Sequence, residues 1–215
     1  MLNNEYYFQV PISEEQEKFA NKLVDFSINH HKVPNVWDGN ITKPEQTREY
    51  RLTGTLGEII FADAYSLERP TKSFGAIDGQ DYGKDFQIEF NGNIINVDTK
   101  TMHRKKGVFY SNYVLNIPSS QLHRKDSITD YYFCISIHQE NDCKFASFLG
   151  LIKKSDVING IIGKLYTAGT VRIRADKTTF EFFQDTYEID FKDIISPPLT
   201  KRIKEIEGYQ KLKLK

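Results

Sequence analysis

Residues 85–100 of this chain read DFQIEFNGNIINVDTK, and in them apolar and polar residues alternate on both sides of Asn91-Gly92. Such alternation is typical of a strand with one buried face, and Asn-Gly between two such runs is the strongest short signal for a tight hairpin turn. The stretch therefore predicts two antiparallel strands with an apolar face and a polar face.

The turn also fixes which residues face each other across this hairpin. A two-residue turn at Asn91-Gly92 pairs Phe90 with Asn93 and, five residues further from the turn, Asp85 with Asp98. In this register the apolar pairs share one face and the polar pairs share the other, as a half-buried hairpin requires.

The predicted pair of carboxylates indicates a cation site. Directly opposed residues have Cβ atoms about 5 Å apart, and two carboxylates there repel by roughly 3 kcal/mol at an effective dielectric constant near 20. A hard cation such as Mg²⁺ would offset this repulsion, because it prefers oxygen ligands. Lys100 lies two residues after Asp98 and projects from the same face. A metal ion beside an ammonium suits phosphodiester hydrolysis.

Helices are predicted before this hairpin. Residues 13–16 (Ser-Glu-Glu-Gln) form a capping box, and apolar residues at helical spacing, Phe26 among them, extend a helix that ends before Pro34. A loop follows at 33–43. A second helix is expected over about 45–67; its two glycines, Gly54 and Gly57, indicate close approach by another part of the chain.

Shorter elements are predicted after the hairpin. They are a short helix at 118–126, paired strands at 131–137 and 144–152, a second hairpin within 171–183, and a basic, helical tail after Pro197-Pro198. This order predicts an α/β domain with a mixed sheet. We expect one domain over 1–215, with its core at about 45–156 and flanks at 1–43 and 157–215 that carry specificity and dimer contacts.

The charge is unevenly distributed although the formal net charge is zero. Residues 78–98 contain five acids and one base, residues 99–125 contain six bases and no acid, and residues 201–215 contain six bases and two acids. An acidic stretch followed directly by a basic one suits a cation site beside a groove for a polyanion.

The composition predicts a folded protein without disulfides. Aromatic residues make up 13% of the chain, too much core material for a disordered protein. Cys134 and Cys143 are too few for a disulfide scaffold, so a reducing compartment is expected. The first residues lack a secretory-signal pattern, and no apolar run reaches the ~20 residues of a membrane span. We therefore expect a cytoplasmic protein without membrane contact.

In its site residues the chain resembles the PD-(D/E)-x-K nuclease superfamily, the restriction-endonuclease-like fold. Asp85 and Asp98-Thr99-Lys100 match the motif, Glu58 lies on the preceding helix, and the element order is similar over roughly 45–156. Lys84 stands where the motif has proline. The resemblance implies an αβββαβ core with a mixed central sheet flanked by helices.

The same resemblance implies a set of site residues. Asp85 and Asp98 would be metal ligands, the Thr99 carbonyl a third, and Glu58 a further ligand or water contact. Lys100 would position the nucleophilic water. Glu49 or Glu68 could take the place of Glu58 if the helix packs differently. Mg²⁺ is the expected metal, Mn²⁺ a substitute, and no organic cofactor is implied.

The expected partner is DNA. Basic residues that follow the motif suit phosphate contacts, with aromatic residues interleaved among the first of them: His103, Arg104, Lys105, Lys106, Arg124 and Lys125. We predict a metal-dependent endonuclease of the restriction type, acting as a homodimer to cut both strands. The alternatives are a repair or recombination nuclease, which the same core can serve, and a non-catalytic nucleic-acid-binding module.

Overall fold

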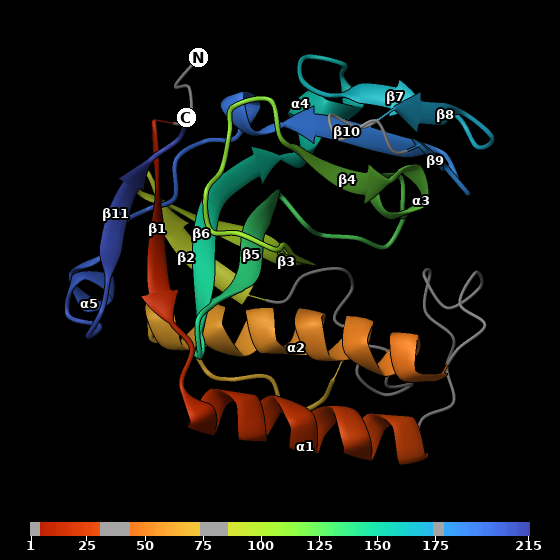
Figure 1. The fold of residues 1–215 in the computed structure, drawn as a ribbon. Coiled ribbons are helices and arrows are strands. Elements are labelled where there is room, and N and C mark those ends of the chain that lie inside the picture. The colour runs from red at the N-terminus through yellow and green to blue at the C-terminus, as the bar shows by residue number, and fades with distance from the viewer. Residues whose placement is uncertain (1–4, 31–43, 74–85, 174–178) are drawn as a thin grey trace.

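In the computed structural model the protein is built in layers (Figure 1). The structure describes residues 5–30, 44–73, 86–173 and 179–215, with the backbone alone at 44–47. Two long helices, α1 (Glu14–His30) and α2 (Pro44–Tyr65), lie on one side of a six-stranded sheet. A smaller sheet lies on the other side. The expected α/β class with a mixed central sheet is confirmed.

The six-stranded sheet contains both parallel and antiparallel pairs. In spatial order its strands are β11 (Gln210–Lys213), β1 (Tyr6–Pro11), β6 (Cys143–Lys153), β5 (Tyr131–Glu140), β3 (Asn93–His103) and β2 (Phe86–Phe90). The β3–β5 pair is parallel and the other four pairs are antiparallel. A parallel pair needs a crossover connection, here made by residues 104–130.

The predicted hairpin is present. Strands β2 and β3 pair in the expected register from Phe86–Val97 to Phe90–Asn93. Asn91 and Gly92 both have positive φ, 51° and 76°, which is the requirement of the two-residue turn that Asn-Gly favours. Turn chemistry and the apolar face thus set the register together.

Both predicted long helices form. The capping box at the start of α1 is closed: the Ser13 amide donates to Gln16 Oε1 at 2.9 Å, and the Gln16 amide donates to Ser13 Oγ at 3.2 Å. Phe26 is nevertheless 55% exposed, because its ring stacks on His30 along the helix surface instead of entering the core. In α2, Phe61 is fully buried among aromatic residues.

A second sheet covers the other face of the main sheet. Its strands are β4 (Val114–Pro118), β10 (Thr186–Asp190) and β7 (Lys164–Tyr166), and β8 (Val171–Ile173) with β9 (Thr179–Glu181) forms the second predicted hairpin. The order α2, β2, β3, β4, α3, β5 agrees with an αβββαβ succession, but β4 pairs in this second sheet.

Two apolar cores separate the layers. The first lies between α2 and the main sheet and includes Val97 and Phe133; the second lies under the smaller sheet and includes Tyr132 and Cys134. Because side chains alternate across a strand, Phe133 of β5 enters the first core and its neighbours Tyr132 and Cys134 enter the second. The other helices in the described residues are short: α3 (Ser119–Leu122), α4 (Lys154–Ile158), α5 (Lys201–Lys204) and the 3-10 helix η2 (Phe191–Asp193).

Two predictions about local structure need correction, and one strand was not predicted. The helix expected at 118–126 ends at Leu122, and Arg124 instead bonds to Asp126 two residues later, a pairing that a helix does not allow. The tail is helical only over Lys201–Lys204 and forms strand β11 from Gln210, where Leu212 lies between two lysines. Strand β1, which the sequence analysis did not predict, pairs with both β6 and β11.

The loop expected at 33–43 lies outside the described residues. Within the described part of the chain, no helix has the length and apolar character needed to cross a membrane.

Candidate active site

Asp98 and Lys100 lie together on one face of β3, as predicted. Lys100 Nζ donates to Asp98 Oδ1 at 2.5 Å, and the two side chains are 22% and 15% exposed, respectively. The residues that alternate with them, Val97 and Thr99, are buried on the α2 side of the sheet. Asp98 and Lys100 therefore face the side of the second sheet, away from the long helices.

Tyr132 lies beside this ion pair. It is the cross-strand partner of Asp98 on β5, and Lys100 Nζ lies 5.3 Å from its ring centroid. Burial, and to a smaller extent the negative charge of Asp98, raise the pKa of the Tyr132 hydroxyl. The hydroxyl donates to the carbonyl of Gln121 at 3.4 Å. The Tyr132 hydroxyl thus stays protonated, and the ring packs beside the lysine with a favourable cation–π contact.

The predicted partner acid, Asp85, lies outside the described residues, and so does Lys84. The confirmed register extends to Phe86–Val97, and the Asp85–Asp98 pair remains a prediction. No three His, Cys, Asp or Glu side chains gather as a metal site within the described ranges. The carboxylate of Asp98 and the backbone carbonyl of Thr99 are nevertheless hard oxygen donors of the kind that Mg²⁺ takes.

Glu58 lies on the part of α2 that contacts β3. A Cβ added to the neighbouring Gly57 would collide with the side chain of Thr101 on β3, so the glycine permits the close approach of helix and strand. Glu58 itself is half-buried, whereas the alternatives Glu49 and Glu68 are exposed, and Glu68 follows the end of α2. Of the three acids, Glu58 is the one next to Gly57, the residue at the contact between α2 and β3.

The first predicted nucleic-acid contacts divide into exposed residues and one that is packed inward. His103, Lys105 and Lys106 are exposed. Arg104 instead lies over the adjacent rings of Tyr113 and Phe191, 4.9 and 5.2 Å from their centroids. Its guanidinium donates to the Val114 carbonyl at 2.8 Å, and desolvation lowers its pKa. These contacts give Arg104 a packing role within the fold.

The loop that carries these lysines is fixed to the main sheet. The carbonyl of Gly107 accepts a hydrogen bond from Tyr7 Oη at 3.0 Å and one from Gln9 Nε2 at 2.8 Å. There is no space for a side chain at Gly107, because His138 and Gln9 fill the position that a Cβ would take. Lys105 and Lys106 therefore project from an anchored loop.

The second predicted group of contacts follows α3. Arg124 forms a two-fold hydrogen-bonded pair with Asp126, at 2.7 and 2.9 Å, and Lys125 is exposed. The Arg124–Asp126 pair reduces the positive charge that the sequence analysis assigned to this segment.

Two charged residues near Asp98 were missed by the sequence analysis. Asp130, just before β5, accepts hydrogen bonds at Oδ2 from the amide and side chain of Asn96, at 2.8 and 2.9 Å. Lys154, just after β6, donates from Nζ to Ser127 Oγ at 3.0 Å. Asp130 and Lys154 are far from Asp98 in the sequence, so their proximity could not be predicted from local pattern. The two adjacent lysines at 153–154, which follow an apolar strand, did indicate a positively charged strand end.

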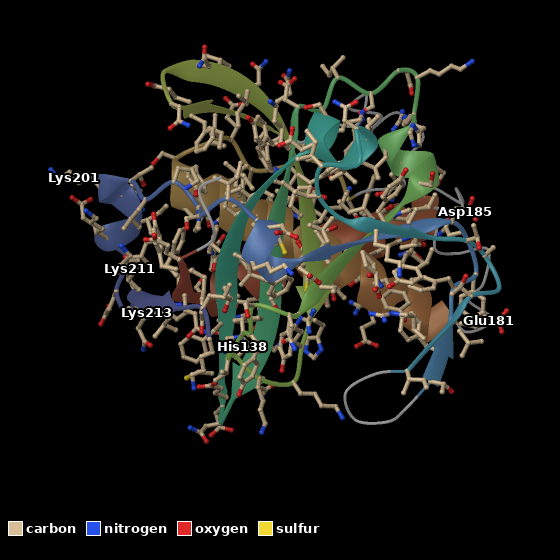
Figure 2. All side chains as sticks on the ribbon, turned by 90° about the horizontal axis from the view of Figure 1, so that it is seen from above. His138, Glu181, Asp185, Lys201, Lys211 and Lys213 are labelled. Atoms are coloured by element: carbon tan, nitrogen blue, oxygen red, sulfur yellow. The ribbon has the colours of Figure 1, made fainter. Side chains whose placement is uncertain are left out.

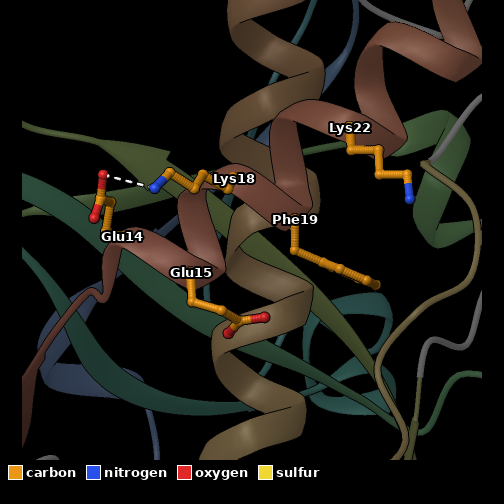
Figure 3. A pocket seen from close by; sticks show the side chains of 5 residues that line it. All are labelled: Glu14, Glu15, Lys18, Phe19 and Lys22. Atoms are coloured by element: carbon orange, nitrogen blue, oxygen red, sulfur yellow. Dashed lines mark ion pairs between the residues drawn. The ribbon is translucent and has the colours of Figure 1, made fainter.

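Two further surface features lie apart from Asp98. Lys201, Lys211 and Lys213 lie on one side of the molecule, across from Glu181 and Asp185 (Figure 2). A hollow on α1 is lined by Glu14, Glu15, Lys18, Phe19 and Lys22, with a Glu14–Lys18 ion pair (Figure 3). Helix α1 belongs to the helical layer, whereas Asp98 is on the face of the sheet that this layer does not cover.

No family model, curated protein or solved structure matches this chain.

Proposed function

We propose that the protein is a metal-dependent endonuclease that hydrolyses DNA phosphodiester bonds, with Asp98 and Lys100 at its active site. The observation that carries the proposal is the Asp98–Lys100 pair: an acid and an amine 2.5 Å apart on one sheet face, largely removed from solvent. It supports the expectation drawn from the hairpin register and the motif.

The donor set suits Mg²⁺, with Mn²⁺ as a substitute. Asp98, Asp85 and the Thr99 carbonyl would hold the ion. Glu58, predicted as a further ligand or water contact, lies on α2, which covers the opposite face of the sheet from Asp98, so Glu58 is not assigned to the ion. When bound, the metal would polarise a phosphoryl oxygen and lower the pKa of a water molecule. In this assignment Asp98, which accepts a hydrogen bond from the Lys100 ammonium, would be a ligand of the metal in the active enzyme.

Lys100 has the positioning role in this proposal. Tyr132 on one side and Asp98 on the other restrict where its ammonium can lie. With Asp98 bound to a metal ion, the Lys100 ammonium would be able to orient a water molecule. It would also stabilise negative charge that develops on the phosphate. A preorganised donor at this position needs little rearrangement during the reaction.

DNA would reach this site along the exposed basic residues of the anchored loop, Lys105 and Lys106, and past Lys125 beyond α3. Such contacts neutralise backbone phosphates and hold the strand in place, but they do not read sequence. One chain carries one such site, so cleavage of both strands at one place calls for two copies, as a two-fold dimer would supply.

The test is incubation of the protein with plasmid and with single-stranded DNA, with Mg²⁺ or with a chelator, followed by mapping of the ends. Defined cuts in both plasmid strands that need Mg²⁺ support the restriction type. Mg²⁺-dependent cleavage of structured or single-stranded DNA instead favours the repair class. Binding without cleavage, and without heat on titration of Mg²⁺ that Asp98→Ala abolishes, identifies a binding module.

The dimer has its own test. Sedimentation of the protein bound to duplex DNA should give two chains per complex, and monomers alone on the DNA contradict this part of the proposal.

A further inference from the structure

A second lysine lies at the same end of the main sheet as the Asp98–Lys100 pair. The amide of Lys154 donates to the Asp130 carbonyl at 3.0 Å, and the amide of Asp130 donates to the Asn96 carbonyl at 2.9 Å. Asn96, Asp130 and Lys154 thus form a row in which Asp130 directly precedes β5 and Lys154 directly follows β6, two residues along the strands from the row of Asp98 and Tyr132. Because neighbouring strands are ~4.8 Å apart, the backbone of Lys154 lies roughly 10 Å from β3, and its long side chain can cover much of that gap.

The surroundings of the Lys154 ammonium differ from those of the lysines nearby. Its described hydrogen-bond partner is the neutral hydroxyl of Ser127, and within the described ranges it has no ion pair with a carboxylate. Lys100 pairs with Asp98 and Lys153 with Asp156.

Burial lowers the pKa of Lys154, and the charges of Asp98 and Asp130 raise it in opposition. The Lys154 ammonium is therefore close enough to Asp98 for an electrostatic interaction, although it forms no hydrogen bond with that carboxylate.

This arrangement leaves hydrogen-bonding capacity at a partly buried cation. An ammonium has three donors, and Ser127 takes one of them. Phosphate oxygens are strong acceptors for such a group, and charge-assisted bonds are about twice as strong as neutral ones. Resting on the function proposed above, we propose that Lys154 binds a backbone phosphate of the DNA strand, next to the phosphate that lies at Asp98.

The neighbouring Lys153 does not share this position. Lys153 is the cross-strand partner of Tyr131, on the other face of the strand, and its ammonium lies 3.9 Å from Asp156. Lys153→Ala is thus a matched control that removes the same charge at the adjacent position.

The experiment measures fluorescence anisotropy of a short labelled DNA duplex, with Ca²⁺ in place of Mg²⁺, over a range of salt concentrations. Lys154→Ala should weaken binding about tenfold, the value expected for one charge-assisted hydrogen bond. It should also make the slope of log affinity against log salt less steep by about one. Lys154→Arg should retain most of the affinity, and Lys153→Ala should bind like the wild type. Urea unfolding of each variant separates a loss of fold from a loss of contact.

The outcomes distinguish this inference from the proposed function. If Lys154→Ala keeps the affinity and salt slope of Lys153→Ala, the inference is wrong, even where the wild type cleaves DNA with Mg²⁺. If it loses stability but keeps the salt slope, Lys154 is structural and the inference is also wrong. Lys154-dependent binding by a protein that does not cleave overturns the nuclease and leaves this contact standing. A wild type that does not bind DNA overturns both.

Discussion

The Lys100 ammonium and the Asp98 carboxylate are two residues apart on one strand and 2.5 Å apart in space, and both project toward Tyr132. The ammonium thereby occupies one oxygen of the proposed metal ligand. The proposed metal would compete with this ion pair, so its affinity and the position of Lys100 would be coupled.

We expect Asp98→Asn and Lys100→Ala each to abolish cleavage while DNA binding stays within a few-fold of the wild type. The reason is that these side chains serve the reacting phosphate, whereas phosphate contacts along the groove supply the affinity. Gel assays of cleavage and anisotropy of binding measure the two effects. Asp190→Asn is a matched control, because Asp190 pairs with Lys192 at 3.0 Å in the same D-x-K spacing elsewhere. Equal loss of cleavage in the control would contradict the assignment.

Substitutions of Arg104 and Lys106 should have different effects, because Arg104 serves packing and Lys106 is proposed to contact DNA. Arg104→Ala removes a guanidinium held by two rings and a carbonyl, and it should lower the free energy of unfolding by about 1–3 kcal/mol. Lys106→Ala should leave stability within about 0.5 kcal/mol and reduce the salt slope of DNA binding by about one. Urea unfolding and anisotropy check the two results. A stable Arg104→Ala variant that no longer binds DNA would reverse the assignment.

Gly57→Ala should destabilise the protein, although alanine is ordinarily the better helix residue by up to about 1 kcal/mol. The added Cβ would meet the Thr101 side chain, and overpacking of this kind costs about 1–3 kcal/mol. Thr101→Ala in the same chain should restore part of the loss, because it removes two of the three colliding atoms. The free energies of the single and double variants, measured by urea unfolding, test this coupling; additive effects would contradict it.

His138 should make the protein less stable in mild acid. Its side chain is fully buried, and neither ring nitrogen has a hydrogen-bond partner among the described residues. Burial lowers its pKa below 6.5, against the smaller opposing effect of Glu140, whose Oε1 lies 3.7 Å from Nε2. As the pH falls, the unfolded chain takes up the proton first. The contribution of the neutral ring is therefore complete above about pH 6.5 and is lost between that pH and the pKa of the folded state.

The check on His138 is the free energy of unfolding at about pH 7.5 and about pH 5.5, values on either side of the ordinary histidine pKa. His138→Gln should lose less stability over this interval than the wild type. The exposed His103, substituted in the same way, serves as the control. An equal acid loss in the wild type and in His138→Gln would show that other groups are responsible.

The two cysteines should differ in reactivity. Burial raises the pKa of the Cys134 thiol to about 12, whereas Cys143 is exposed at the end of β6. A thiol reagent should label Cys143 in the native protein and reach Cys134 after denaturation, because the thiolate is the reactive form. Mass mapping of the labelled peptide checks this, and rapid labelling of native Cys134 would contradict its burial.

Local pattern was enough to predict a good part of the fold. The capping box at Ser13, the helical spacing before Leu67 and the Asn91-Gly92 turn are short-range signals, and each set an element that the structure contains. The same turn placed Asp98 and Lys100 on one face of a strand. These inferences succeeded because side-chain periodicity and turn geometry depend on residues close together in the sequence.

Short-range signals were therefore sufficient for the hairpin, its register and the shared strand face of Asp98 and Lys100. The other features depend on long-range packing. Tyr132 lies beside the Asp98–Lys100 pair, and Arg104 packs inward. Strands β1 and β11 join the main sheet, and Lys154 comes close to Asp98. Each of these depends on pairing between strands far apart in the chain, above all the parallel β3–β5 pair. No local period encodes such pairing, because it is set by which buried faces the whole chain can cover at once.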